Sequence, residues 1–137
     1  MSLEANKALV RRFIDEILVQ GRRGAIDELL SDDFVSHTWR STVDGKGDLK
    51  RAMERLSEAL ADVCFTVEDV IAEGDRLVVR VIASATQVGE FMGRPPSGRS
   101  YTIGEIHIFR LRDGRLCEHW HQYDQLGLLR QLGAMPG

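Results

Sequence analysis

The spacing of apolar residues changes near residue 60, and this change constrains the fold more than any other feature of the sequence. Before it, apolar residues recur every three or four positions, which is typical of amphipathic helices. This spacing predicts a helix over 4–20 that ends at Gly21 and a short helix over 24–30. A third helix is predicted over about 49–60, with Asp48 as its N-cap.

After this point the chain is rich in β-branched residues and in turn signals. Asp113-Gly114 is a strong hairpin signal, and Glu73-Gly74-Asp75 is a second turn. The strands that we predict cover 63–72, 76–87, 100–111 and 115–124, after an earlier short strand at 34–38 and before a last helical turn at 125–132. Helices followed by antiparallel strands predict an α+β fold rather than an alternating βαβ fold.

Composition limits the class of protein. The chain has 137 residues, a formal net charge of −3 and 43% apolar residues, so we expect one globular domain over 1–137. The charge argues against a dedicated nucleic-acid binder. We expect no membrane span, because no apolar run approaches the roughly 20 residues needed. Charges near the start argue against an export signal. The two cysteines, Cys64 and Cys117, make no disulfide framework, so we expect a cytoplasmic location.

The last two predicted strands each have two mixed faces. One face of 100–111 carries Tyr101, Ile103, Glu105, His107 and Phe109. One face of 115–124 carries Leu116, Glu118, Trp120, Gln122 and Asp124. The opposite face of the same strand carries Cys117, His119, His121 and Tyr123. Alternation alone does not decide which face looks inward, and a β-bulge would exchange the two faces partway along a strand.

One long segment and two shorter ones carry a resemblance to a known family. They are GEFMGRPPSGRSYTIGEIHIFRLRDGRLCEHWHQYDQLGLLRQLG, FVSH at 34–37 and VEDVIAEGDRLVVR at 67–80. In these segments the chain resembles the SnoaL-like polyketide cyclase family. The resemblance implies a nuclear-transport-factor-2-like, cystatin-like α+β fold. In that fold a cone-shaped, curved antiparallel or mixed sheet and about three N-terminal helices enclose a pocket.

The resemblance also implies a reaction. Characterised members close a ring in an aromatic polyketide ester by intramolecular aldol condensation, without a metal or an organic cofactor, and an aspartate near the end of the last strand is the general acid/base. By similarity Asp124 takes this role, and His37 and His107 are polar residues of the active site. The pocket-lining residues that we expect are Trp120, Phe13, Ile17, Trp39, Phe91 and Glu105. The ligand would be a small apolar carbonyl or polyketide-like compound.

The chemistry suits these residue types. A carboxylate whose pKa is raised by burial can take a proton from an activated carbon and deliver it to a carbonyl oxygen. A histidine or tryptophan N–H can stabilise the enolate oxygen. Two positions depart from the family pattern: Gln87 stands where relatives carry a histidine, and the loop STVDGKG lacks a proline. Gly93, Pro95, Pro96 and Gly98 are expected to shape a loop at the pocket mouth.

Structural explanations compete with these roles. Asp124 can cap the turn that follows it. His37 and His107 can be ordinary half-buried histidines. His119 and His121 lie on one strand face, but two ligands, even with Cys117, are too few for a metal site, so we expect no metal and interpret that face as solvated or as an interface.

Other functions stay open on the same fold. The alternatives are a ketosteroid isomerase-, dehydratase- or epoxide hydrolase-like enzyme, or a non-enzymatic ligand-binding or association module. The resemblance implies a homodimer or a higher homo-oligomer, in which two sheets pack together.

Overall fold

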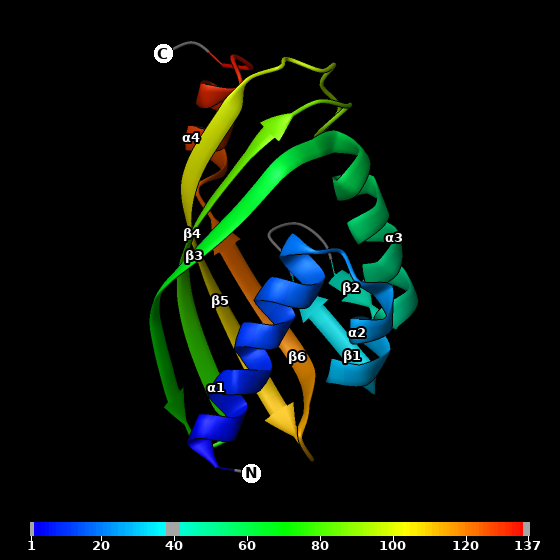
Figure 1. Ribbon diagram of the computed structural model, residues 1–137, viewed down its shortest axis with the longest axis vertical. Coiled ribbons are helices and arrows are strands. Elements are labelled where there is room, and N and C mark those ends of the chain that lie inside the picture. The colour runs from blue at the N-terminus through cyan, green and yellow to red at the C-terminus, as the bar shows by residue number, and fades with distance from the viewer. Residues whose placement is uncertain (1, 38–41, 136–137) are drawn as a thin grey trace.

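The computed structural model describes residues 2–37 and 42–135. Figure 1 shows a long, curved sheet with α1 running across it and with α2 and α3 to one side. The elements are α1 (Leu3–Arg12), a π-helix η1 (Phe13–Val19), α2 (Arg23–Leu29), β1 (Leu30–His37), β2 (Thr42–Asp44), α3 (Gly45–Ala59), β3 (Leu60–Glu73), β4 (Arg76–Gln87), β5 (Ser100–Arg112), β6 (Arg115–Tyr123) and α4 (Gln125–Gln131). The predicted α+β order of helices and strands is confirmed.

The helices differ from the predicted ones in detail. The predicted first helix is an α-helix that continues as η1, and Gly21 ends it with a φ of +66°. The third helix begins at Gly45, so Asp48 lies in its first turn and the prediction that Asp48 is the N-cap is wrong. None of the helices in the described ranges is long and apolar enough to cross a membrane.

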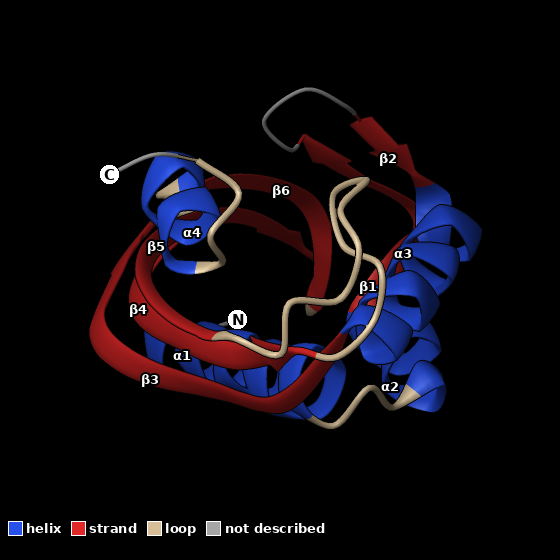
Figure 2. Ribbon diagram, turned by 90° about the horizontal axis from the view of Figure 1, so that it is seen from above, coloured by secondary structure: helices blue, strands red, loops and turns tan. Residues whose placement is uncertain are grey.

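The sheet has six strands in the order β2-β1-β6-β5-β4-β3. All neighbouring strands run antiparallel except β1 and β6, which run parallel. The short strand β2 was not predicted. Figure 2 shows the long strands curling around the inside of the molecule, with α4 at one rim and the loop before β5 crossing above. The concave face is called the inner face below, and the opposite one the outer face.

A β-bulge at Cys117 decides which side chains of β6 face inward. At the turn end of the β5–β6 hairpin Leu111 pairs with Leu116, whereas Arg110 pairs with Glu118. Cys117 is therefore one extra residue on β6, and it and Leu116 are both buried although they are consecutive. Because side chains alternate along a strand, the extra residue exchanges the two faces of everything beyond it.

The main core fills the space between η1 and the inner face. Phe13 of η1 packs edge-on against Phe109 of β5, with ring centroids 5.1 Å apart. Ile17, on the same helix, is 1% exposed. A second apolar cluster lies under α4 and contains Tyr101, Ile103, Leu128 and Leu132 together with two alanines of β4. These contacts hold η1 and α4 against the sheet.

Gly89 provides a test of the packing between α3 and the loop after β4. A Cβ at this position would lie inside van der Waals contact with the Glu58 carbonyl oxygen and 3.3 Å from the Ala59 Cα. Both neighbours are backbone atoms, so they cannot move aside cheaply. We expect Gly89→Ala to lower the free energy of unfolding by about 1–3 kcal/mol in urea titrations. Gly104→Ala is the matched control, because nothing lies within 4 Å of its Cβ position, and an equal loss there would contradict the steric explanation.

Candidate active site

A chain of hydrogen-bonded polar side chains runs across the inner face over three neighbouring strands. Ser36 Oγ of β1 lies 2.6 Å from Nδ1 of His119 on β6. His119 Nε2 lies 2.8 Å from Nδ1 of His107 on β5. Glu105 Oε1 then lies 2.9 Å from His107 Nε2 and 2.9 Å from His121 Nε2. We call these five residues the inner polar cluster.

The sheet register explains why the cluster forms. His107 pairs with His121 and Glu105 with Tyr123 across the β5–β6 hairpin, and Ser36 pairs with His119 across the parallel β1–β6 pair. The imidazole rings of His107 and His121 stack with centroids 4.1 Å apart. Throughout the described residues, every buried side-chain nitrogen or oxygen has a hydrogen-bond partner. The buried polar atoms of the cluster are therefore all hydrogen-bonded, as buried polar groups normally are.

Glu105 is held in its ionised form. Burial of the carboxyl group raises its pKa, but hydrogen bonds from His107 and His121 outweigh burial and bring the pKa down to about 2. A carboxylate this weakly basic is a poor proton acceptor at neutral pH. It is well suited to orient two imidazoles and to stabilise positive charge on either of them.

His107 and His119, the two most buried histidines of the cluster, favour the neutral form. Burial lowers the pKa of His107 and lowers that of His119 well below its usual value, because the interior disfavours the charged form. His121 is the most open of the three inner histidines, with 19% of its side chain exposed. Its Nδ1 has no hydrogen-bond partner among the described residues. Because a carboxylate only accepts hydrogen bonds, Nε2 is the nitrogen of His121 that donates to Glu105.

Two tyrosines flank Glu105 on the inner face. Burial, then the charge of Glu105, raises the pKa of Tyr101 to about 12, and the same two causes raise that of Tyr123. Tyr123 also stacks on His121, with ring centroids 5.1 Å apart. Both hydroxyl groups therefore stay protonated at neutral pH and can donate hydrogen bonds to a developing oxyanion.

Glu105, His107 and His121 also offer three ligand atoms within 4.8 Å of one another, which is a possible metal-binding set. The Nε2 atoms of His107 and His121 each lie 2.9 Å from Oε1 of Glu105. In this structure the three side chains are therefore joined to one another by hydrogen bonds.

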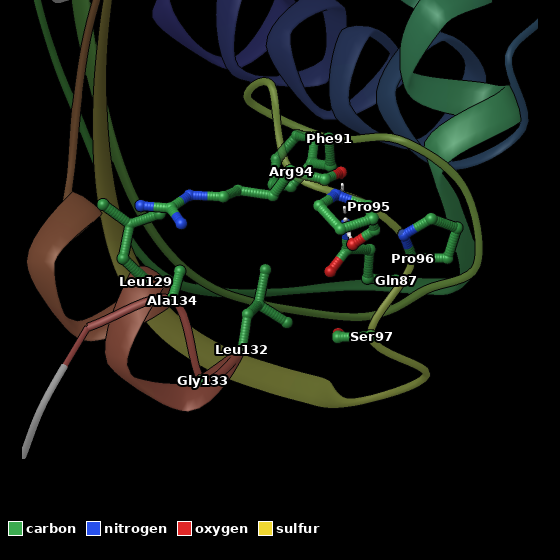
Figure 3. Close-up of a pocket in the computed structure, with 10 residues that line it drawn as sticks. All are labelled: Gln87, Phe91, Arg94, Pro95, Pro96, Ser97, Leu129, Leu132, Gly133 and Ala134. Carbon is green, nitrogen blue, oxygen red and sulfur yellow. Dashed lines mark hydrogen bonds between the residues drawn. The ribbon is translucent and has the colours of Figure 1, made fainter.

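A pocket of about 260 Å³ lies at the rim, between the loop before β5 and α4 (Figure 3). Its apolar walls include Phe91, Pro95 and Leu132. Gln87, 1% exposed, fixes this loop because its Nε2 donates to the carbonyl oxygens of Gly89, Arg94 and Pro95 at 3.1–3.3 Å. None of the five residues of the inner polar cluster lines this pocket.

The structure places Asp124 at the surface. Asp124 is exposed and caps α4, with its Oδ1 accepting a hydrogen bond from the Gly127 backbone N–H at 2.9 Å. Asp124 is therefore not buried in a pocket as expected, because β6 ends at Tyr123 and Asp124 is the N-cap of α4. The capping explanation is confirmed. A catalytic role for Asp124 stays a prediction.

His37 and Trp120 lie on the outer face, so the expected pocket positions of both are corrected. They are neighbours across the β1–β6 pair and stack with ring centroids 5.5 Å apart. His37 Nε2 lies 2.8 Å from Glu118 Oε2, also on the outer face. The structure therefore does not bring His37 together with His107. The bulge at Cys117 is the physical reason that Trp120 faces outward.

The other expected pocket residues have mixed outcomes. Glu105 and His107 come together in the inner polar cluster. Phe91 lines the rim pocket, whereas Phe13 and Ile17 are core residues. Trp39 lies outside the described residues.

Sequence reasoning missed His119 and His121 as members of the site, and Ser36 as well. The prediction that the strand face carrying the two histidines is solvated or an interface is wrong, because both histidines lie on the inner face. A clue was present in the sequence. The consecutive apolar residues Leu116 and Cys117 break the alternation, as a bulge often does.

The curved six-stranded sheet with its helices has the nuclear-transport-factor-2-like and ketosteroid isomerase-like fold, which two solved structures share with TM-scores of 0.80 and 0.79. The family model described as SnoaL-like polyketide cyclase matches residues 8–132. The chain belongs to the SnoaL-like polyketide cyclase family.

Individual relatives agree with this assignment. The chain is 26% identical to the nogalonic acid methyl ester cyclase of Streptomyces nogalater over 125 residues, covering 82% of this chain and 87% of the relative. Among solved structures, TsrD from Streptomyces laurentii is 31% identical with a TM-score of 0.89, over 98% of this chain and 99% of that one. A putative SnoaL-like polyketide cyclase from Jannaschia sp. CCS1 is 28% identical with a TM-score of 0.89, over 98% and 95%.

Proposed function

We propose that this protein is a polyketide cyclase-like enzyme that closes a ring in a small apolar carbonyl compound by general acid/base catalysis, without a metal or an organic cofactor. The observation that carries the proposal is the buried Glu105 carboxylate bonded to His121 Nε2, which leaves His121 Nδ1 without a partner among the described residues. A histidine oriented by a buried carboxylate is a common arrangement for proton transfer. The membership of the family supports a polyketide-like substrate.

The mechanism follows from the roles of these groups. His121 Nδ1 takes a proton from the activated carbon of the substrate, and the electron pair of the C–H bond becomes the enolate. Glu105 stabilises the resulting imidazolium through the Nε2–H hydrogen bond. The enolate carbon attacks the carbonyl carbon within the same molecule, and His121 returns the proton to the new alkoxide. Tyr101 and Tyr123, which stay protonated, are suited to donate to the oxyanion.

The first experiment incubates the purified protein with nogalonic acid methyl ester and with aklanonic acid methyl ester, the substrates that the names of the relatives indicate. Cyclisation by aldol condensation conserves mass. We expect a product of unchanged mass and altered absorption. A product lighter by one water would instead indicate dehydration, and a product heavier by one water would indicate hydrolysis. Failure to turn over either ester or a panel of smaller 1,3-dicarbonyl compounds would contradict the proposed function.

Asp124 provides a prediction that separates capping from catalysis. Asparagine is as good an N-cap as aspartate but cannot exchange a proton. If the cap is the only role, Asp124→Asn retains activity within about twofold, and Asp124→Ala costs about 1 kcal/mol of stability. Urea titration and initial rates measure the two effects. A fall of 100-fold or more in the rate of a folded Asp124→Asn variant would instead make Asp124 the general acid/base.

A homodimer stays part of the proposal. His119, His121 and Tyr123, which the sequence places on a possible interface, face inward, so a second subunit would have to cover the outer face. That face carries Ile106, which is 48% exposed, and the half-buried Trp120. Gel filtration with light scattering checks the mass, and a mass of one chain at micromolar concentration would contradict this part of the proposal.

A further inference from the structure

We propose that Ser36 and His119 are positioning residues that lock His107 in one tautomer, with its Nε2–H directed at Glu105. Through this lock they keep the Glu105 carboxylate in line with the base His121. The consequence for catalysis rests on the proposed function, whereas the tautomer assignment rests on hydrogen-bond geometry alone.

The hydrogen bonds leave one arrangement of protons. A neutral imidazole carries a single N–H, so His107 can donate from either Nδ1 or Nε2. Its Nε2 faces the ionised Glu105 at 2.9 Å, and a carboxylate only accepts hydrogen bonds. His107 must therefore carry its proton on Nε2, and its Nδ1 accepts from His119 Nε2–H at 2.8 Å. His119 Nδ1 then accepts from the Ser36 hydroxyl at 2.6 Å.

Burial makes this arrangement the stable one. Ser36 and His107 are each 2% exposed and His119 is 6% exposed, so water has little access to replace a missing donor. Desolvation keeps both histidines neutral. Rotation of the His119 ring is opposed by Phe109, whose ring centroid lies 4.7 Å away. Each link of the chain thus has one donor, one acceptor and a packed ring to hold it.

The lock matters because Glu105 Oε1 is shared between His107 and His121. If His107 changed tautomer, its Nε2 lone pair would face the carboxylate, and the two acceptors would repel each other. Glu105 would then turn away and its hydrogen bond to His121 would weaken. Ser36 and His119 touch no reacting atom in this account, so they act through His107 and Glu105 on the rate of proton transfer.

The test is nitrogen-15 NMR of the histidine rings in the full chain. Only His37, His107, His119 and His121 are present, so single variants assign the spectrum. At pH 7.5 we expect His107 and His119 to carry a proton on Nε2 and none on Nδ1. His119→Phe keeps the ring packing but removes the donor, and we expect the His107 signals to move to a mixture of tautomers. A His107 proton on Nδ1, or His107 signals unchanged in His119→Phe, would overturn the proposal.

Conservative variants keep the test independent of folding defects. Ser36→Ala removes the hydroxyl donor to His119, whereas Ser36→Thr retains it. We expect a changed His119 tautomer ratio in the alanine variant and a native ratio in the threonine variant. His119→Gln retains an N–H donor, so it is expected to restore much of the His107 signal that His119→Phe loses. Identical spectra for both members of each pair would contradict the lock.

Kinetics decide the catalytic consequence. On the ester that the protein turns over, we expect His119→Phe to lower kcat about tenfold with KM within twofold, because one aligned donor is lost from the proton-transfer machinery. His119→Gln should recover most of kcat. An unchanged kcat in a variant with altered tautomers would overturn the positioning role. A wild-type protein without turnover would overturn the proposed function, and NMR would still decide the tautomer assignment.

Discussion

Glu105→Gln is expected to lower the rate of cyclisation by roughly 10²–10⁴-fold while the protein stays folded. The glutamine has the same shape and can still accept a hydrogen bond from His107 or His121. It has no charge, however, so it does not stabilise the imidazolium that forms when His121 takes a proton. The effect therefore falls on kcat more than on KM. Initial rates at pH 7.5, with circular dichroism as the check on folding, measure it.

The chain offers a matched control for this variant. Glu118 on the outer face also accepts a hydrogen bond from a histidine, His37, at 2.8 Å, and from Arg110 at 3.0 Å. Glu118→Gln removes the same charge from a similar pair on the opposite side of the sheet. We expect its rate to stay within about twofold of wild type, as is usual for a change remote from the chemistry. A Glu105→Gln rate above one tenth of wild type would remove Glu105 from the mechanism.

The second large effect is a loss of stability on mild acidification. The pKa values of His107 and His119 are lowered in the folded protein from an ordinary value of 6.5. Below pH 6.5 these two histidines therefore bind protons in the unfolded chain but not in the folded one. The stability that the two neutral histidines contribute is fully present above pH 6.5 and falls as the pH drops below this value. The slope is up to about 1.4 kcal/mol per pH unit for each histidine.

Glu105 adds a second loss of stability on acidification, which occurs at lower pH. Its folded pKa is about 2, against an ordinary value of 4.5, so its contribution is complete above pH 4.5 and is lost as the pH falls towards 2. The full contribution is about 3 kcal/mol. The groups that face this carboxylate are His107, His121, Tyr101 and Tyr123.

Urea titrations at pH 7.5 and pH 5.0 test the loss of stability that is due to His107 and His119. We expect a marked fall in the free energy of unfolding between the two values. In His119→Phe, which removes the buried histidine whose pKa is lowered well below its ordinary value, the fall should be clearly smaller. A free energy of unfolding that is the same at both values would show that neither histidine is held neutral by burial.

Much of the fold could be predicted because local patterns carry it. The helix ending at Gly21 follows from apolar spacing and from a residue suited to positive φ. The β5–β6 hairpin follows from alternation and from Asp113-Gly114. The strand β2 could not be predicted, because three residues offer too short a pattern and their pairing with β1 is a tertiary contact.

The site was only partly predictable, for a reason that concerns a single residue. Glu105 and His107 share one face of β5 whatever the rest of the chain does, so alternation already placed them together. A regular hairpin through Asp113-Gly114 would place Trp120 opposite His107. The bulge at Cys117 shifts this pairing by one residue and brings His121 there instead.

The sequence by itself determined the order of the elements, the α+β class and the grouping of Glu105 and His107 on one face of β5, because these depend on residues close together in the chain. Only the tertiary structure decided that β6 turns His119 and His121 inward and Trp120 outward, and that Ser36 closes the chain of hydrogen bonds from β1. The physical reason is that a strand has a side-chain period of two. One extra residue exchanges its faces, and whether it is accommodated depends on packing against strands that are distant in the sequence.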